Sequence, residues 1–257
     1  MDLSDQTRTL ATLYARQAEI RPDPYLHAHS RNQAVIQRQV QIFNRCAKHF
    51  DSATVVLDWG CRQAADACLM RLYLGGEAQL HGCDVDPGDY EAFFEFAGLE
   101  YRQLRHPYLL PYEDNTFDVV LGSGVLEHVP IDGESLKELY RIIRPGGRLV
   151  ITMLPNRLSY TEFLNRRLHN PHHLRRYSRK EILRMLMHRG FLPLESGYHQ
   201  ILPTLSSPKG GIFNLRAASR LVESLWPLNS ALEQIPIVRS VATNIFVVAK
   251  KVEAFHG

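Results

Sequence analysis

Short apolar runs alternate with longer amphipathic stretches along most of this chain. Six runs rich in β-branched and aromatic residues, each bounded by turn-forming residues, are predicted to be strands: 53–58, 79–84, 117–122, 148–153, 191–198 and 242–250. Apolar residues at helical spacing predict five helices: 30–50, 64–74, 89–98, 134–143 and 178–189. Strands that alternate with helices predict a mostly parallel sheet that is covered on both faces.

Two segments do not fit a minimal alternation of strands and helices. Residues 154–177 and 199–241 are longer than the connections of a compact domain usually are. We predict that they form a lid over the substrate, with an amphipathic stretch at 212–226. We predict that the chain divides into an N-terminal helical arm, 1–50, and a catalytic domain, 51–257, which contains both inserts.

Composition excludes several classes of protein. A chain of 257 residues that is 45% hydrophobic and 22% charged is long enough for one α/β domain with a sizeable core. Its formal net charge of +3 is too small to argue for nucleic acid, although segment 155–189 carries nine basic and two acidic residues. No apolar run reaches the roughly 18 residues of a membrane span. Four cysteines without metal-site spacing, and a polar start, predict a cytoplasmic protein.

Two motifs follow one another in the middle of the chain. Residues 110–121 form a polar turn and a buried strand, and the next loop places Glu127 and His128 just beyond the carboxyl end of that strand. Residues 139–151 then read as a helix, a Pro-Gly-Gly turn and another strand. Their order and spacing resemble class I S-adenosylmethionine-dependent methyltransferases of the small-molecule, UbiE/UbiG-like type.

This resemblance implies a fold and a cofactor. The expected fold is α/β: a Rossmann-like, doubly wound, seven-stranded and mostly parallel sheet with an antiparallel last strand. The expected cofactor is S-adenosyl-L-methionine, with the carboxylate of Asp84 on its ribose. The residues that we expect to contact it are Asp58, Gly60, Cys61, Asp84, Val85, His106, Tyr108, Ser123, Gly124 and Glu127.

The chain departs from the family pattern at three of its positions. Arg62 and Ala64 stand where relatives carry the second and third glycines of the first loop, and His106 stands where many carry an adenine-binding aspartate. The structural alternatives are that Asp58 caps the following helix and that Asp84 only forms a turn.

Candidate catalytic residues come from the loops after the predicted strands at 117–122 and 148–153. A hydroxyl acceptor needs a base with a pKa near neutrality, and His128 is the first candidate. The basic segment offers others. Its possible bases are His172, His173 and Tyr177, and its acceptor-binding residues are Arg175, Arg176 and Asn156. A solvated basic loop is the structural alternative. We expect no metal, since no acidic or thiol partner lies near these histidines in the sequence.

The predicted function is methyl transfer from S-adenosylmethionine to a hydroxyl group of a small or lipid-linked compound. A saccharide or glycan precursor is the first acceptor, a quinone or lipid phenol the second, and an anionic acceptor suits the arginines. Three rivals are a non-catalytic scaffold with this fold, a nicotinamide oxidoreductase and a nucleic-acid methyltransferase. We expect no nucleic-acid partner. Peripheral membrane contact and the oligomeric state stay open.

Overall fold

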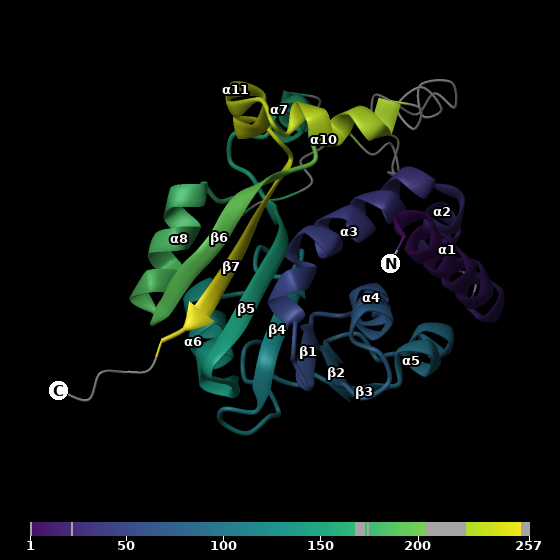
Figure 1. Ribbon diagram of the computed structural model, residues 1–257, viewed down its shortest axis with the longest axis vertical. Helices are drawn as coiled ribbons and strands as arrows, with labels where there is room; N and C mark the ends of the chain where they lie inside the picture. Colours follow the sequence, from purple (N-terminus) through teal and green to yellow (C-terminus); the bar gives the residue numbers. More distant parts are fainter. Residues whose placement is uncertain (1, 22, 168–172, 174, 204–224, 253–257) are drawn as a thin grey trace.

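A seven-stranded sheet forms the centre of the protein in this computed structural model (Figure 1). The structure describes residues 2–21, 23–167, 173, 175–203 and 225–252. The strands are β1 (Val55–Trp59), β2 (Gln79–Asp84), β3 (Leu99–Gln103), β4 (Phe117–Ser123), β5 (Ile143–Pro155), β6 (Phe191–His199) and β7 (Asn244–Lys251).

The order of the strands across the sheet is β3-β2-β1-β4-β5-β7-β6. Pairs among β1 to β5 are parallel, and β7 is antiparallel to both β5 and β6. The predicted fold class, including the antiparallel last strand, is therefore confirmed. The strand order reverses between β1 and β4, and in open α/β sheets ligands bind outside the carboxyl ends of the strands at such a point.

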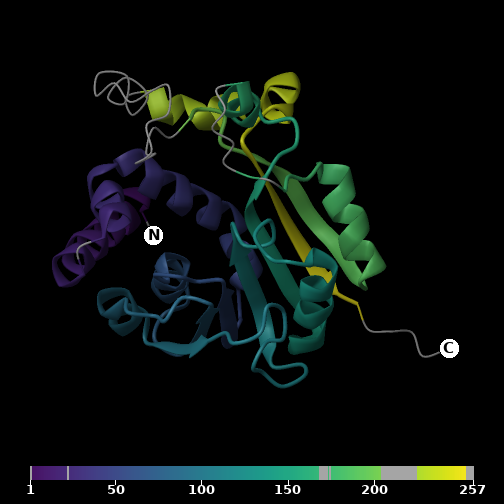
Figure 2. The ribbon, with the colours of Figure 1, turned by 180° about the vertical axis from the view of Figure 1, so that it is seen from behind.

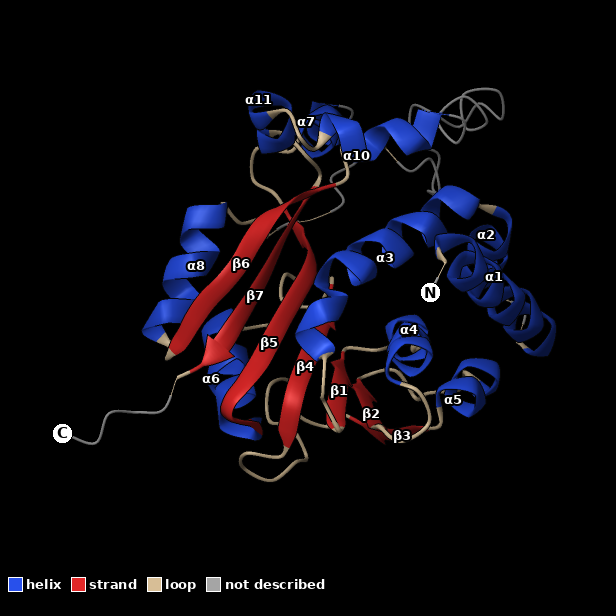
Figure 3. Ribbon diagram, in the orientation of Figure 1, coloured by secondary structure: helices blue, strands red, loops and turns tan. Residues whose placement is uncertain are grey.

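Helices surround the sheet (Figure 3). They are α1 (Leu3–Ile20), α2 (Pro24–Arg31), α3 (Gln33–Cys46), α4 (Ala65–Leu74), α5 (Glu91–Ala97), α6 (Asp132–Ile142), α7 (Tyr160–Arg167), α8 (Arg179–His188), α10 (Asn229–Leu232) and α11 (Pro236–Ser240), with short 3₁₀ turns at Ala47–Phe50 and Trp226–Leu228. None of the described helices is long and apolar enough to cross a bilayer.

Buried apolar side chains form two clusters, one on each face of the sheet. Residues of α1 to α5 build the first, and residues of α6 and α8 build the second. Strand β7 contributes to both, since Phe246 and Val248 belong to the first cluster and Ile245, Val247 and Ala249 to the second. This alternation follows from the two-residue period of a strand and makes β7 a buried central strand.

The N-terminal arm consists of three helices that pack over α4 and α5 (Figure 2). The buried hydroxyl of Tyr14 in α1 accepts a hydrogen bond of 2.9 Å from Gln63, which lies in the loop after β1. Tyr14 also makes a T-shaped contact with Phe93 of α5, with 5.0 Å between ring centroids. The arm therefore contacts the loop where the cofactor was predicted.

The Pro-Gly-Gly turn differs from its predicted form. The helix ends at Ile142, and β5 begins at Ile143, so the turn lies within the strand as an irregularity in its pairing with β4. A β-carbon on Gly147 would lie 2.9 Å from the carbonyl oxygens of Arg144 and Asp118. Only glycine fits there, because neither backbone carbonyl can move aside cheaply.

The two inserts pack against each other near the carboxyl end of β5 (Figure 3). The hydroxyl of Tyr160 donates a hydrogen bond of 2.6 Å to the Ile201 carbonyl, and Asn156 donates from its amide to the carbonyls of Ser240 and Ala242. The predicted lid remains a prediction. Its amphipathic stretch lies mostly outside the described residues, as does all of 204–224.

Glu233 joins the second insert to the arm. Its buried carboxylate accepts hydrogen bonds from Asn229 and from the backbone of Gln200, and it pairs with His199 at 3.0 Å and with Arg45 of α3 at 3.1 Å. Replacing the carboxylate by an amide weakens the hydrogen bonds to one oxygen, since they lose a charged acceptor, and places an N–H donor where the other oxygen accepts from Arg45.

We expect Glu233→Gln to lower the free energy of unfolding by about 2–4 kcal/mol, because a broken buried ion pair leaves the partner charge uncompensated. The measurement is urea denaturation, with limited proteolysis of the insert as a second readout. Glu19→Gln, at an exposed position of α1, is the control and should have no effect. Equal stability of both variants would contradict a structural role for Glu233.

Candidate functional site

The loop after β1 and the end of β2 meet at the reversal of strand order. Asp84, the last residue of β2, accepts hydrogen bonds from the backbone N–H of Arg62 at 2.8 Å and of Asp86 at 3.0 Å. Each oxygen takes one of these bonds, which fixes the orientation of the carboxylate. Carboxylate oxygens have further acceptor capacity, so Asp84 is able to bind two hydroxyl groups of a ligand as well.

The first loop keeps the backbone conformation of a glycine-rich loop despite its sequence. Gly60, Arg62 and Ala64 all have positive φ angles, of 70°, 43° and 62°. A β-carbon on Gly60 would meet the Val125 side chain at 2.5 Å, so glycine is required there. At the other two positions the chain accepts the left-handed conformation with a side chain, at a cost of about 1–2 kcal/mol per residue.

The arm accounts for the side chain of Arg62. Its guanidinium lies over the Tyr25 ring, 4.0 Å from the centroid, and 3.9 Å from the carboxylate of Asp23. Tyr25 lies in the first turn of α2, and Asp23 is the residue that caps the start of this helix. An arginine in the place of a family glycine thus fastens the N-terminal arm to the loop by a cation–π contact and an ion pair.

The other predicted cofactor residues surround this loop, and their roles stay predictions. Val85 is 69% exposed directly after Asp84. His106 is exposed, and its Nδ1 accepts a hydrogen bond of 3.0 Å from the backbone of Leu109. Tyr108 is half-buried beside His106, with 4.8 Å between ring centroids. Ser123 and Gly124 end β4 next to the reversal point.

Two carboxylates lie buried below the loop. Asp58 at the end of β1 accepts a hydrogen bond of 3.0 Å from the Ala67 backbone, so it caps α4, as the structural alternative anticipated. The side chains of Gln39 and Ser123 lie near Asp66 and favour its charged form. Burial raises the pKa of Asp66 to about 6, and burial followed by the charge of Asp66 raises the pKa of Asp58.

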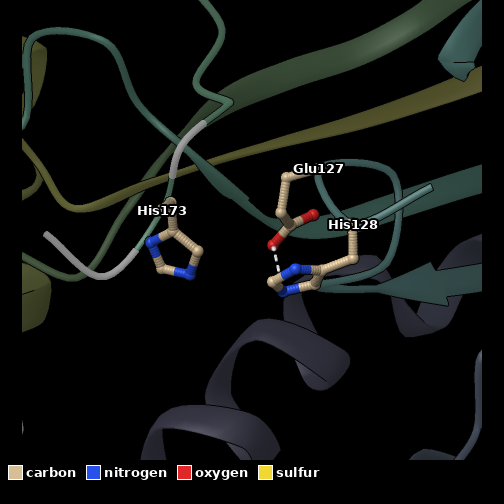
Figure 4. Close-up of side chains that lie close together, drawn as sticks. All are labelled: Glu127, His128 and His173. Atoms are coloured by element: carbon tan, nitrogen blue, oxygen red, sulfur yellow. Dashed lines mark ion pairs between the residues drawn. The ribbon is translucent and has the colours of Figure 1, made fainter. Parts of the chain in front are cut away.

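A second group of polar residues lies after β4. Glu127, His128 and His173 each offer one atom to a cluster in which these atoms lie within 4.8 Å of one another (Figure 4). Glu127 is buried, with 3% of its side chain exposed, and burial raises its pKa to about 7. His128 is 63% exposed, and its Nε2 lies 3.8 Å from Glu127 Oε1. Burial, and then the nearby His173, lower the pKa of His128.

Sequence reasoning missed Glu162. This residue of α7 has only 3% of its side chain exposed, and its Oε1 lies 2.9 Å from Nδ1 of His173. A buried carboxylate that accepts a hydrogen bond from Nδ1 holds the proton on that nitrogen, and Nε2 then carries the lone pair of the ring. The expectation that no acid lies near the histidines is wrong, because Glu127 and Glu162 both do. One signal was available: an acidic residue in a markedly basic segment.

Arg175 and Tyr177 hold the cluster together from outside. Arg175 donates hydrogen bonds to the carbonyls of Val129 at 2.6 Å and Pro130 at 3.0 Å. The buried hydroxyl of Tyr177 bonds to Asp132 at 3.0 Å and to the Leu126 carbonyl at 3.3 Å. Arg175 was predicted to bind the acceptor, and Tyr177 to act as a base. In the structure, both form contacts that hold the loop carrying Glu127 and His128 in place.

The remaining predicted residues lie elsewhere. Asn156 is buried, and its amide donates a hydrogen bond to the Ser240 carbonyl of the second insert. Arg176 does not belong to the cluster. It lines an open pocket of ≈ 440 Å³, and Glu127, His128 and His173 are not among the lining residues of this pocket. Its lining residues are Asp132, Arg157, Arg175, Arg176, Tyr177 and Glu181. His172 lies outside the described residues.

Comparisons with known proteins agree with the predicted fold and family. Residues 57–151, from β1 to β5, match the family model of a methyltransferase domain. The chain contains a class I S-adenosylmethionine-dependent methyltransferase domain. The resemblance inferred from the two motifs is confirmed, and S-adenosylmethionine is the cofactor of this family.

Two curated relatives illustrate the similarity. A demethylmenaquinone methyltransferase of Streptomyces avermitilis is 39% identical over 90 residues, which are 29% of this chain and 39% of the relative. A probable S-adenosylmethionine-dependent methyltransferase of Mycolicibacterium smegmatis is 30% identical over 165 residues, 63% of this chain and 58% of the relative. The chain therefore matches less than two thirds of either relative.

Solved structures share the fold of this methyltransferase domain. The crystal structure of a SAM-dependent methyltransferase from Archaeoglobus fulgidus superposes with a TM-score of 0.58 at 19% identity, covering 82% of this chain and 92% of that one. At this identity the likeness concerns the fold alone.

The buried Asp66 makes stability depend on pH. Its pKa of about 6 in the folded protein lies above the ordinary value of 3.8, so the folded state binds the proton more tightly. The resulting stabilisation is present below about pH 4 and is lost as the pH rises to about 6. We expect Asp66→Asn to remove this dependence, so that it gains roughly 2 kcal/mol relative to the parent between pH 4 and 7.

The measurement is the free energy of unfolding against pH for the parent and Asp66→Asn. Glu77→Gln, at an exposed position, should follow the parent curve throughout. A constant difference between Asp66→Asn and the parent would show that the carboxylate titrates normally.

Proposed function

We propose that the protein transfers the methyl group of S-adenosylmethionine to a hydroxyl oxygen of a small or lipid-linked compound. One observation carries this proposal: two groups of polar residues lie at the carboxyl ends of the strands. The oriented carboxylate of Asp84 lies beside the loop of Gly60, and the cluster of Glu127 and the two histidines follows β4.

The cofactor half of the proposal rests on the first loop and Asp84. Asp84 binds the ribose hydroxyls, and Gly60 allows the backbone of the loop to approach the nucleoside. Arg62 and Ala64 do not argue for loss of the site, because both have positive φ angles despite their side chains. This weakens the case for a non-catalytic scaffold. It also makes the contact between Arg62 and Tyr25 a route by which the arm stabilises the loop.

The acceptor half rests on the cluster. In the reaction, the bond between carbon and sulfonium breaks with its electron pair going to sulfur, and a bond from the acceptor oxygen to that carbon forms. The hydroxyl proton must leave. His128, after β4, and His173, which follows α7 and is oriented by the buried Glu162, are suited to assist its departure. Aligning the oxygen, the methyl group and sulfur supplies the rest of the rate.

The acceptor itself has two candidates. A saccharide or glycan precursor was expected first, and it stays a prediction. The similarity to a demethylmenaquinone methyltransferase supports a quinol or other phenol as the second candidate. A panel of saccharide, phenol and quinol acceptors, incubated with S-adenosylmethionine carrying a labelled methyl group, distinguishes them. Position-specific analysis of the product tells an oxygen acceptor from a ring carbon.

We expect Asp84→Asn to weaken binding of S-adenosylmethionine about 10–100-fold, because hydrogen bonds to a charged acceptor are worth about 1.5–3 kcal/mol. Isothermal titration calorimetry measures the dissociation constant. Asp89→Asn, with its side chain 72% exposed five residues further on, is the matched control and should bind like the parent. An unchanged constant in Asp84→Asn would remove this residue from the site, and absent binding by the parent protein would overturn the proposal.

We expect His173→Ala to lower kcat about 10²–10⁴-fold, the usual contribution of a group that assists proton transfer. Binding of S-adenosylmethionine should change less than twofold, since His173 lies in the acceptor half. His188→Ala, an exposed histidine of α8, is the control. Full turnover by His173→Ala would show that this imidazole takes no part in the reaction.

A further inference from the structure

The donor atoms of Glu127, His128 and His173 converge on one point. In Figure 4 the Glu127 carboxylate and the His128 ring lie together, and a nitrogen of the His173 ring is turned toward them. The second oxygen of Glu127 is buried and has no hydrogen-bond partner. A buried carboxylate oxygen without a partner is costly, and a ligand at this point would satisfy it.

The contact between His173 and Glu162 strengthens this observation. Histidines that bind metals usually donate their other ring N–H to a carboxylate or carbonyl, which fixes the ring and makes the free nitrogen a better ligand. Glu162 Oε1 lies 2.9 Å from Nδ1 of His173 and so occupies this outer position. A ligand at the cluster would then be bound through Nε2.

We propose that Glu127, His128 and His173 bind a divalent transition-metal ion. Two imidazoles and one carboxylate form a donor set suited to Zn²⁺, Fe²⁺, Co²⁺ or Mn²⁺, whereas Mg²⁺ and Ca²⁺ prefer oxygen ligands. Ligands about 2.1 Å from one ion lie roughly 3–4 Å apart. The three atoms are within 4.8 Å of one another, so small side-chain rotations, chiefly of the exposed His128, bring them around one ion.

Three protein ligands leave coordination positions open, which distinguishes catalytic from structural metal sites. Here the inference rests on the proposed function and deepens it: with the ion bound, His128 and His173 assist loss of the acceptor proton as ligands of the cation and not as bases themselves. An acceptor hydroxyl that binds at an open position has its pKa lowered by the cation, and its proton passes to water on the exposed side of His128. The oxygen then attacks the methyl group. A vicinal diol, a catechol or a hydroxy acid offers two oxygens and is the acceptor class that such a site favours.

Cobalt(II) is the most direct probe, because its visible absorption reports the number and type of its ligands. We expect the metal-free protein to bind one equivalent with the spectrum of a mixed nitrogen–oxygen site. Glu127→Gln and His173→Ala should lose this binding. Glu162→Gln should weaken it about 10–100-fold, as losses of such outer contacts typically do. His188→Ala should bind like the parent.

A measurement on the unaltered protein guards against variants that fail to fold. Mn²⁺ at substoichiometric concentration should broaden the NMR signals of the His128 and His173 imidazoles and leave that of His188 sharp. The proposal is overturned if cobalt does not bind, if it binds equally to Glu127→Gln and His173→Ala, or if Mn²⁺ broadens all histidines alike. Calorimetry with S-adenosylmethionine separates the two proposals. A protein that binds the cofactor but no metal would support methyl transfer and overturn the metal site. A protein that binds metal but no cofactor would support the metal site and overturn methyl transfer.

Discussion

The contacts between residues 175–177 and the loop after β4 hold together the cluster that we propose as the acceptor site. Arg175 and Tyr177 donate hydrogen bonds to the carbonyls of Leu126, Val129 and Pro130. Tyr177 is in turn bonded through its backbone to Pro155 and Arg157 at the end of β5. These contacts bring the segment of His173 against Glu127 and His128.

A similar constraint acts on the cofactor side. Both oxygens of Asp84 are held by backbone N–H groups, one from the first loop and one from the turn after β2. The loop therefore cannot change its conformation without releasing Asp84. This explains how a loop with an arginine and an alanine in place of two glycines keeps its form. The strain of two left-handed residues is offset by this bond and by the packing of Arg62 on Tyr25.

Periodicity predicted the sheet well because strands and helices bury regular faces. The runs at 79–84 and 117–122 match β2 and β4 within a residue, and the helix predicted at 178–189 is α8, which begins after a capping box at Ser178. The helical division of the arm was not resolved, since polar and apolar residues alternate there around side chains such as Gln17 that are buried against other helices. The Pro-Gly-Gly turn was misplaced because its glycines serve a strand irregularity.

Candidate residues divide in the same way. Four of them lie at the carboxyl end of a strand or shortly after it: Gly60, Asp84, Glu127 and His128. Predicting the strands was therefore enough to predict where these residues lie. Arg175 and Asn156 were predicted to bind the acceptor and Tyr177 to act as a base, from their residue types and their place after the strand at 148–153. The structure uses all three in contacts with backbone carbonyls. Residue type does not distinguish an arginine that binds an anion from one that binds its own loop.

The sequence by itself determined the order of the elements, the fold class and the family of the domain, because these depend on local periodicity and on motifs with short spacing. Only the tertiary structure decided that Glu162 meets His173, that Glu127 joins two histidines from separate loops, and that Arg62 serves the arm. The geometry of those contacts follows from how inserts and helices pack on the finished sheet, which local periodicity does not determine.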